Sequence, residues 1–191
     1  MAASLPQKPL VWIDCEMTGL NFKQNKIMEI AVLITDGDLH TVDKGVEYVV
    51  KVDKEHLDKM DEWCTTQHGQ ACLTQACLDS PHTTEFVAGE VLEYIKKWVP
   101  EPRVALLAGN TVWADRSFLA EEMPEVVNYL HYRSFASFFI FELCSRWYPT
   151  LPRPDLNIAS KHRALDDIKG SIKELRYYRE NVFVPHFVPW Q

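Results

Sequence analysis

Short apolar runs separated by turn residues fill the first third of the chain. Residues 10–13 form one such run, residues 27–35 (IMEIAVLIT) form a longer and mostly apolar one, and residues 46–52 (VEYVVKV) form a third with β-branched alternation. A strand covered on both faces has a continuous apolar run, whereas a half-covered strand alternates. The pair Asp36-Gly37 marks a turn after the second run. The pattern therefore predicts three strands in an antiparallel meander.

The rest of the chain has mainly helical spacing. Apolar residues recur every three or four positions over residues 55–67 and 83–98, and Pro100 and Pro102 stop the second stretch. The remaining expected elements are a strand at residues 104–108 and helices at residues 114–119, 138–147 and 163–178. This order of elements predicts an α/β fold in which helices flank one mixed sheet.

The composition is that of an ordinary globular domain. The 191 residues are 47% apolar, and we expect a single domain over residues 1–191, with residues 1–8 and 182–191 as flexible or subunit-packing tails. Twenty basic against 27 acidic side chains give a net charge of −7. That net negative charge argues against a protein that binds long nucleic-acid duplexes, because such binding needs a basic face. It allows a small anionic substrate if metal ions offset the carboxylates.

Cysteine usage and the absence of targeting signals indicate the compartment. The five cysteines are an odd number without a C-x-x-C pair, so neither a disulfide framework nor a zinc knuckle is predicted. The first residues lack the pattern of a secretory signal, and no apolar run approaches the roughly 20 residues of a membrane span. We expect a soluble protein of the cytoplasm that does not bind membranes. The sequence does not separate this location from a mitochondrial one.

Two acids at the end of the first strand are the first candidate for chemistry. Asp14 and Glu16 are two residues apart, so in a strand both side chains lie on one face. Neighbouring carboxylates repel each other unless a cation lies between them. The alternative interpretation is a half-exposed strand end that carries two solvated acids.

Further acidic positions occur later in the chain. Asp115 follows a strand and a Gly-Asn turn, where loops commonly present functional groups, although it could also serve only to charge the first turn of a helix. The last helix opens with His162 and, shortly after it, Asp166 and Asp167. A histidine beside acids is a candidate general base because its pKa can lie near neutrality. A structural hydrogen-bonding role is the alternative for this histidine.

These positions resemble a known group of nucleases. The three exonuclease motifs of the DEDDh group are matched, in order and spacing, by Asp14-x-Glu16, Asp115 and His162-x-Ala164-x-x-Asp167. Nearly the whole chain resembles the oligoribonuclease family, in the stretches WIDCEMTGL, KIMEIAVLITD, MDEWCTTQHGQ, LAGNTVWADRSFL, MPEVVNYLHYR, ELCSRWYP and HRALDDIKGSIKELRYYREN. The resemblance implies a ribonuclease H-like fold, a mixed five-stranded sheet flanked by helices.

The resemblance also implies an activity. It is a 3′-to-5′ exoribonuclease that degrades very short RNA, down to dinucleotides, to nucleoside 5′-monophosphates. The implied catalytic and metal-binding carboxylates are Asp14, Glu16, Asp115 and Asp167, which would hold two Mg²⁺ or Mn²⁺ ions, and His162 would take the proton from the attacking water. Oxygen ligands favour these hard cations. Helical spacing alone would pair His162 with Asp166, four residues on, whereas the family pattern selects Asp167.

The same resemblance implies substrate-binding residues and a homodimer. Leu20 matches an apolar wedge between bases, and Trp63 and His68 match residues around the base and the 3′ end. Tyr132 matches an aromatic residue that each subunit contributes to its partner, and Arg133 matches a contact to the 5′ phosphate. By residue type alone, each of these could instead belong to the core or the surface.

The segment 134–141 departs from the family pattern. Ala136 stands where the family usually has aspartate, and Phe138 stands where a serine hydroxyl would face the 5′ phosphate. Thr111 keeps a hydroxyl at a position where the family often has serine. This departure supports an alternative, a broader DEDDh exonuclease that trims longer single-stranded RNA or DNA. A catalytically idle dinucleotide-binding homologue is a second alternative, and the phenylalanines could form a patch that a second subunit covers.

Overall fold

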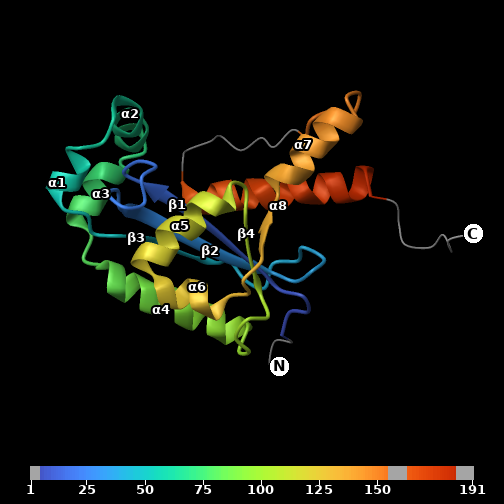
Figure 1. The fold of residues 1–191 in the computed structure, drawn as a ribbon, viewed down its shortest axis with the longest axis horizontal. Helices are drawn as coiled ribbons and strands as arrows, with labels where there is room; N and C mark the ends of the chain where they lie inside the picture. The colour runs from blue at the N-terminus through green and yellow to red at the C-terminus, as the bar shows by residue number, and fades with distance from the viewer. Residues whose placement is uncertain (1–4, 155–162, 184–191) are drawn as a thin grey trace, which may run out of the picture.

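Five strands form one mixed sheet in the computed structural model, which describes residues 5–154 and 163–183 (Figure 1). The order across the sheet is β3-β2-β1-β4-β5. The neighbours β1–β2 and β2–β3 are antiparallel, whereas β1–β4 and β4–β5 are parallel. The strands are β1 (Leu10–Met17), β2 (Ile27–Thr35), β3 (Val46–Val49), β4 (Leu106–Gly109) and β5 (Ser134–Ala136). The predicted meander and mixed five-stranded sheet are confirmed.

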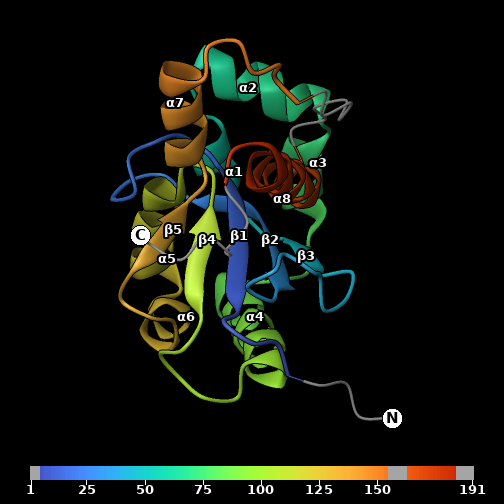
Figure 2. The ribbon, with the colours of Figure 1, turned by 90° about the vertical axis from the view of Figure 1, so that its right-hand side faces the viewer.

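Helices cover both faces of the sheet, as Figures 1 and 2 show for α4 and α8. Their bounds are α1 (Lys54–Leu57), α2 (Glu62–Gln70), α3 (Leu73–Asp79), α4 (Thr84–Trp98), α5 (Val112–Glu122), α6 (Pro124–Tyr129), α7 (Phe138–Trp147) and α8 (Ala164–Asn181). No described helix is both long and apolar enough to cross a membrane. The expected general base, His162, and most of the expected tails lie outside the described residues.

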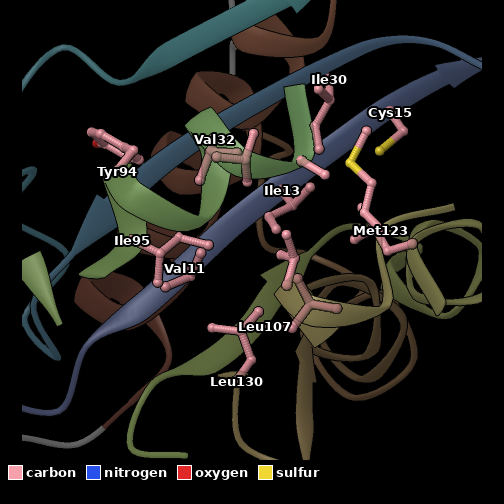
Figure 3. Close-up of a cluster of buried hydrophobic side chains, with 14 of the residues drawn as sticks. Val11, Ile13, Cys15, Ile30, Val32, Tyr94, Ile95, Leu107, Met123 and Leu130 are labelled. Carbon is pink, nitrogen blue, oxygen red and sulfur yellow. The ribbon is translucent and has the colours of Figure 1, made fainter. Parts of the chain in front are cut away.

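The alternation of side chains along β1 divides the core into two layers. Val11, Ile13 and Cys15 pack with residues of α4, α5 and α6, as Figure 3 shows for Tyr94 and Ile95 of α4. The even-numbered Trp12 lies on the other face, where it joins the apolar seam of α8. Asp14 and Glu16 continue this even-numbered series, so the alternation aims both carboxylates at the α8 side of the sheet.

Several boundaries differ from the sequence-based expectation. The helix predicted over residues 55–67 was wrong as one element, because the chain breaks after Leu57 and Asp61 caps a new helix by accepting a hydrogen bond from the Cys64 N–H at 2.7 Å. The short helices α3 and α6 were not predicted. The first strand runs to Met17 rather than ending at Ile13, because β2 continues to pair with it through both acids.

Candidate active site

Three carboxylates converge where the end of β1 meets the start of α8. Asp14 and Glu16 come from β1, and Asp167 comes from the first turn of α8. One oxygen from each lies within 4.8 Å of the other two. The neighbouring Asp166 is not in this group and instead lies 3.4 Å from the Lys169 ammonium. Of the two consecutive acids, α8 therefore directs Asp167 toward the strand acids.

Asp115 joins the same cleft from the opposite side of β1. It is buried in the first turn of α5, and its Oδ1 accepts a hydrogen bond from the Cys15 N–H at 3.0 Å. The parallel pairing of β4 with β1 ends at Trp12, so this carboxylate bonds the backbone of β1 just past the point where the strand pairing stops. Asp115 thus ties α5 to β1 and lines the cleft together with the other three acids.

Burial and mutual repulsion disfavour the charged forms of these acids. Burial, and then the charges of Asp115 and Glu16, raise the pKa of Asp14 well above its usual value. Burial, followed by the charge of Asp167, raises the pKa of Glu16 to about 8, and burial raises the pKa of Asp115 to about 6. A bound cation would relieve this repulsion. Closely grouped carboxylate oxygens are the donors that hard divalent cations prefer, so the cluster fits a metal ion.

A buried ion pair anchors the start of α8 beside the cluster. Glu29 of β2 is fully buried directly opposite Glu16, and its carboxylate accepts hydrogen bonds from the Arg163 guanidinium and the Ala164 N–H. The sequence pattern did not predict this pair. An acid inside the apolar run of residues 27–35 was the available signal, since a buried charge needs a partner.

The cleft beside the acids has a volume of about 620 Å³ and exposed apolar side chains in its lining. Leu20, which is 82% exposed, and Trp63 both line it. Thr111 also lines it, at the N-cap of α5, where its side chain makes no capping hydrogen bond. Trp113, which the sequence motifs did not predict as a site residue, is a further lining residue. The structure therefore places three of the predicted substrate-binding residues around the acids.

Three other predicted substrate-binding residues do not line this cleft within the described part of the chain. His68 is buried behind the end of β1, with Nε2 2.9 Å from the Met17 carbonyl oxygen and Nδ1 3.9 Å from a Glu16 carboxylate oxygen. Tyr132 is exposed and stacks on His131, and the Arg133 guanidinium lies 5.3 Å from the Tyr132 ring centre.

Comparison with known proteins shows that the chain belongs to the exonuclease class. The family model RNase_T, described as an exonuclease, matches residues 11–175. The zinc-bound E. coli ExoI–ssDNA complex has a TM-score of 0.71 at 12% identity, covering 92% of this chain and 41% of that one. Exonuclease I from Methylocaldum szegediense has a TM-score of 0.70 at 16% identity, covering 91% of this chain and 41% of that one. The chain thus has the exonuclease fold and spans about two fifths of these two structures.

Relatives with higher sequence identity identify the family within the exonucleases. A "Probable oligoribonuclease" of Schizosaccharomyces pombe is 47% identical over 91% of this chain and 68% of its own length. The "Oligoribonuclease, mitochondrial" of Bos taurus is 43% identical over 91% and 73%, and an "Oligoribonuclease" of Hydrogenovibrio crunogenus is 40% identical over 93% and 96%. The chain belongs to the oligoribonuclease family of exonucleases.

Proposed function

We propose that the protein is a 3′-to-5′ exoribonuclease that degrades very short RNA, down to dinucleotides, to nucleoside 5′-monophosphates. The convergence of Asp14, Glu16 and Asp167 within 4.8 Å, in a chain of this family, is the observation that carries the proposal. An acidic protein needs local positive charge to bind a phosphodiester. Cations bound by the acidic cluster would provide that positive charge.

Different residues of the chain have different roles in the proposed hydrolysis. Asp14, Glu16, Asp115 and Asp167 would hold two Mg²⁺ or Mn²⁺ ions, which when bound would offset the phosphate charge and supply Lewis-acid activation of water. His162, directly before Arg163 in the sequence, takes the proton from the attacking water at an imidazole nitrogen. Arg163 and Glu29 fix the start of the helix that carries Asp167.

The apolar lining supports a preference for unpaired bases. Leu20 and Trp63 expose large side chains beside the carboxylates, where the bases on either side of a bound phosphodiester would lie. Stacking of a base on an aromatic ring contributes roughly 1–3 kcal/mol and tolerates any sequence. The cleft therefore suits single-stranded substrates of mixed sequence.

Hydrolysis of a 5′-labelled diribonucleotide in Mg²⁺ tests the proposal. We expect a labelled mononucleotide product that disappears with EDTA and with Asp14→Ala, while Asp166→Asn retains activity as the matched control. No product at a concentration where an active relative completes the reaction would reject the proposal. Tight dinucleotide binding without turnover would instead identify an idle binding protein.

A broader exonuclease acting on longer single-stranded RNA or DNA is the second candidate. The half-exposed Phe138 at the start of α7, in place of the family's serine, favours it, because a site without that hydroxyl holds the 5′ phosphate less strictly. Cleavage rates on two- and seven-nucleotide strands separate the candidates. A faster rate on the dinucleotide supports the first, and an equal or faster rate on the longer strand supports the second.

We also propose a homodimer in which each subunit contributes Tyr132 to its partner's site. Tyr132 is exposed and does not line its own subunit's cleft, which supports this assignment. Mixed dimers of Tyr132→Ala with Asp14→Asn test it, because the subunit with intact acids would receive Tyr132 of the partner subunit. Activity above the mean of the two parent variants is expected. A monomer in sedimentation that still cleaves dinucleotides would contradict the dimer.

We infer a reducing compartment for the protein, either the cytoplasm or the mitochondrion. The described chain has five free cysteines, four of them buried, which suits such a compartment. Some relatives carry "mitochondrial" in their names. Fractionation of cells that produce the full-length protein distinguishes the two locations, and recovery from the secretory pathway would contradict both.

A further inference from the structure

Trp113 is an exposed tryptophan that lines the cleft. It lies in the first turn of α5 and is 69% exposed, whereas its neighbours Val112 and Asp115 are buried. The buried face of α5 is thus formed by other residues. Trp113 instead lines the cleft that holds the four acids.

Two other tryptophans, Trp12 and Trp98, have clear structural roles in this chain. Trp12 donates its indole N–H to the Thr35 hydroxyl, and Trp98 donates to Asp43 and lies under the Lys97 ammonium. Among the described residues, the Trp113 indole has neither a hydrogen-bonding partner nor a stacked ring or cation. Its ring is therefore available to a ligand.

Trp113 adds an apolar side chain to the cleft from a different element than Leu20 and Trp63. Leu20 and Trp63 belong to the segments that follow β1 and open α2, whereas Trp113 comes from α5, two residues before Asp115. A phosphodiester held near Asp115 carries one nucleoside on each side. With Leu20 between the two bases and Trp63 against one of them, the other base is free to reach Trp113 on the α5 side of the cleft.

We infer that Trp113 is a base-stacking platform for the nucleotide on the 5′ side of the scissile phosphate. This inference rests on the proposed function and deepens it by naming a residue that determines substrate affinity. The ligand is an unpaired nucleobase, because an indole face offers π-stacking but no hydrogen-bonding pattern that distinguishes bases. The platform therefore strengthens binding without adding sequence preference.

Trp113→Ala tests the inference against a matched control, Trp147→Ala. Trp147 is 66% exposed, lies on α7 and does not line the cleft. Loss of stacking worth roughly 1–3 kcal/mol corresponds to an increase of about 5- to 150-fold in KM for a diribonucleotide. We expect this increase for Trp113→Ala, little change in kcat, a smaller increase for Trp113→Phe, and no change for Trp147→Ala.

An abasic substrate shows whether the base is the partner. With a dinucleotide that lacks its 5′ base, Trp113→Ala and the parent protein should have equal KM, because the stacking contact is already absent. An equal penalty on the abasic and the complete dinucleotide would overturn the inference, as would a Trp113→Ala protein that matches Trp147→Ala.

A binding measurement keeps this test separate from the test of hydrolysis. Calorimetric titration of the parent protein, Trp113→Ala and Trp147→Ala with a diribonucleotide, in Ca²⁺, reports affinity whether or not the protein turns over. Weaker binding by Trp113→Ala alone would support the platform even if hydrolysis were not observed. Equal binding by all three proteins, or no binding by the parent protein, would reject it.

Discussion

Arg163 and Glu29 form a bidentate ion pair between the start of α8 and strand β2. Arg163 Nε lies 2.8 and 3.1 Å from the two carboxylate oxygens, and one terminal nitrogen lies 2.5 Å from the first. Glu29 is fully buried, and the Ala164 N–H donates to the same carboxylate. Because Asp167 lies one helical turn further on, this pair fixes the direction from which Asp167 approaches β1.

Removing the cation of this pair should cost both stability and activity. Arg163→Met leaves a buried carboxylate without its charge partner, which lowers the free energy of unfolding by about 3–5 kcal/mol. A displacement of Asp167 by about 1 Å would also lower kcat on the order of 10²-fold. Urea unfolding and steady-state kinetics measure the two effects.

An exposed pair provides the control for the Arg163 variant. Arg179 pairs with Asp38 at the surface, so Arg179→Met should change stability by no more than about 1 kcal/mol. The double variant Glu29→Gln/Arg163→Met should lose less than the sum of the single losses. Additive losses, or a loss in Arg179→Met as large as in Arg163→Met, would contradict the anchoring role.

The two consecutive acids of α8 should differ sharply in function. Asp167→Asn removes a member of the convergent group and should abolish Mn²⁺ binding and hydrolysis, whereas Asp166→Asn removes only a surface pair with Lys169. Calorimetric titration with Mn²⁺ and the diribonucleotide assay compare them directly. Equal losses in the two variants would show that the carboxylate assignment is wrong.

Stability of the metal-free protein should fall as pH rises. Burial and the neighbouring acids raise the pKa of Glu16 from its ordinary value of 4.5 to about 8, so the folded state binds more protons than the unfolded state between these values. The stabilisation is therefore complete below about pH 4.5 and is lost as pH rises through about 8. Each such group contributes a slope of up to about 1.4 kcal/mol per pH unit.

Urea unfolding between pH 5 and pH 8, with and without Mg²⁺, measures this slope. Glu16→Gln should flatten the slope, and Mg²⁺ should reduce it because the cation replaces the protons. A metal-free protein that gains stability from pH 5 to pH 8 would contradict the electrostatic description of the cluster.

The sequence predicted most of the fold because its apolar periodicity was clear. The run 27–35 became β2 with the expected bounds, and the stretch 138–147 became α7. The helix expected over residues 55–67 failed because its apolar spacing continues across a break that the cap at Asp61 imposes. Periodicity reports which face is buried, whereas a helix boundary depends on individual hydrogen bonds.

The candidate site was predictable only where a local pattern or the family resemblance marked its residues. Strand alternation put Asp14 and Glu16 on one face, and the family resemblance selected Asp167 over Asp166, as the convergent group in the structure also does. The Glu29–Arg163 pair was not foreseen, because 134 residues separate its members and no local pattern joins them. Trp113 was also missed, since only the fold shows that this exposed ring borders the cleft.

Anomalous diffraction from crystals soaked in Mn²⁺ tests the central claim most directly. We predict two anomalous peaks about 3.5–4 Å apart, bounded by the carboxylates of Asp14, Glu16, Asp115 and Asp167. Ordered Mn²⁺ elsewhere on the protein with none between these carboxylates would contradict the claim, and so would unchanged peaks in crystals of Asp167→Asn.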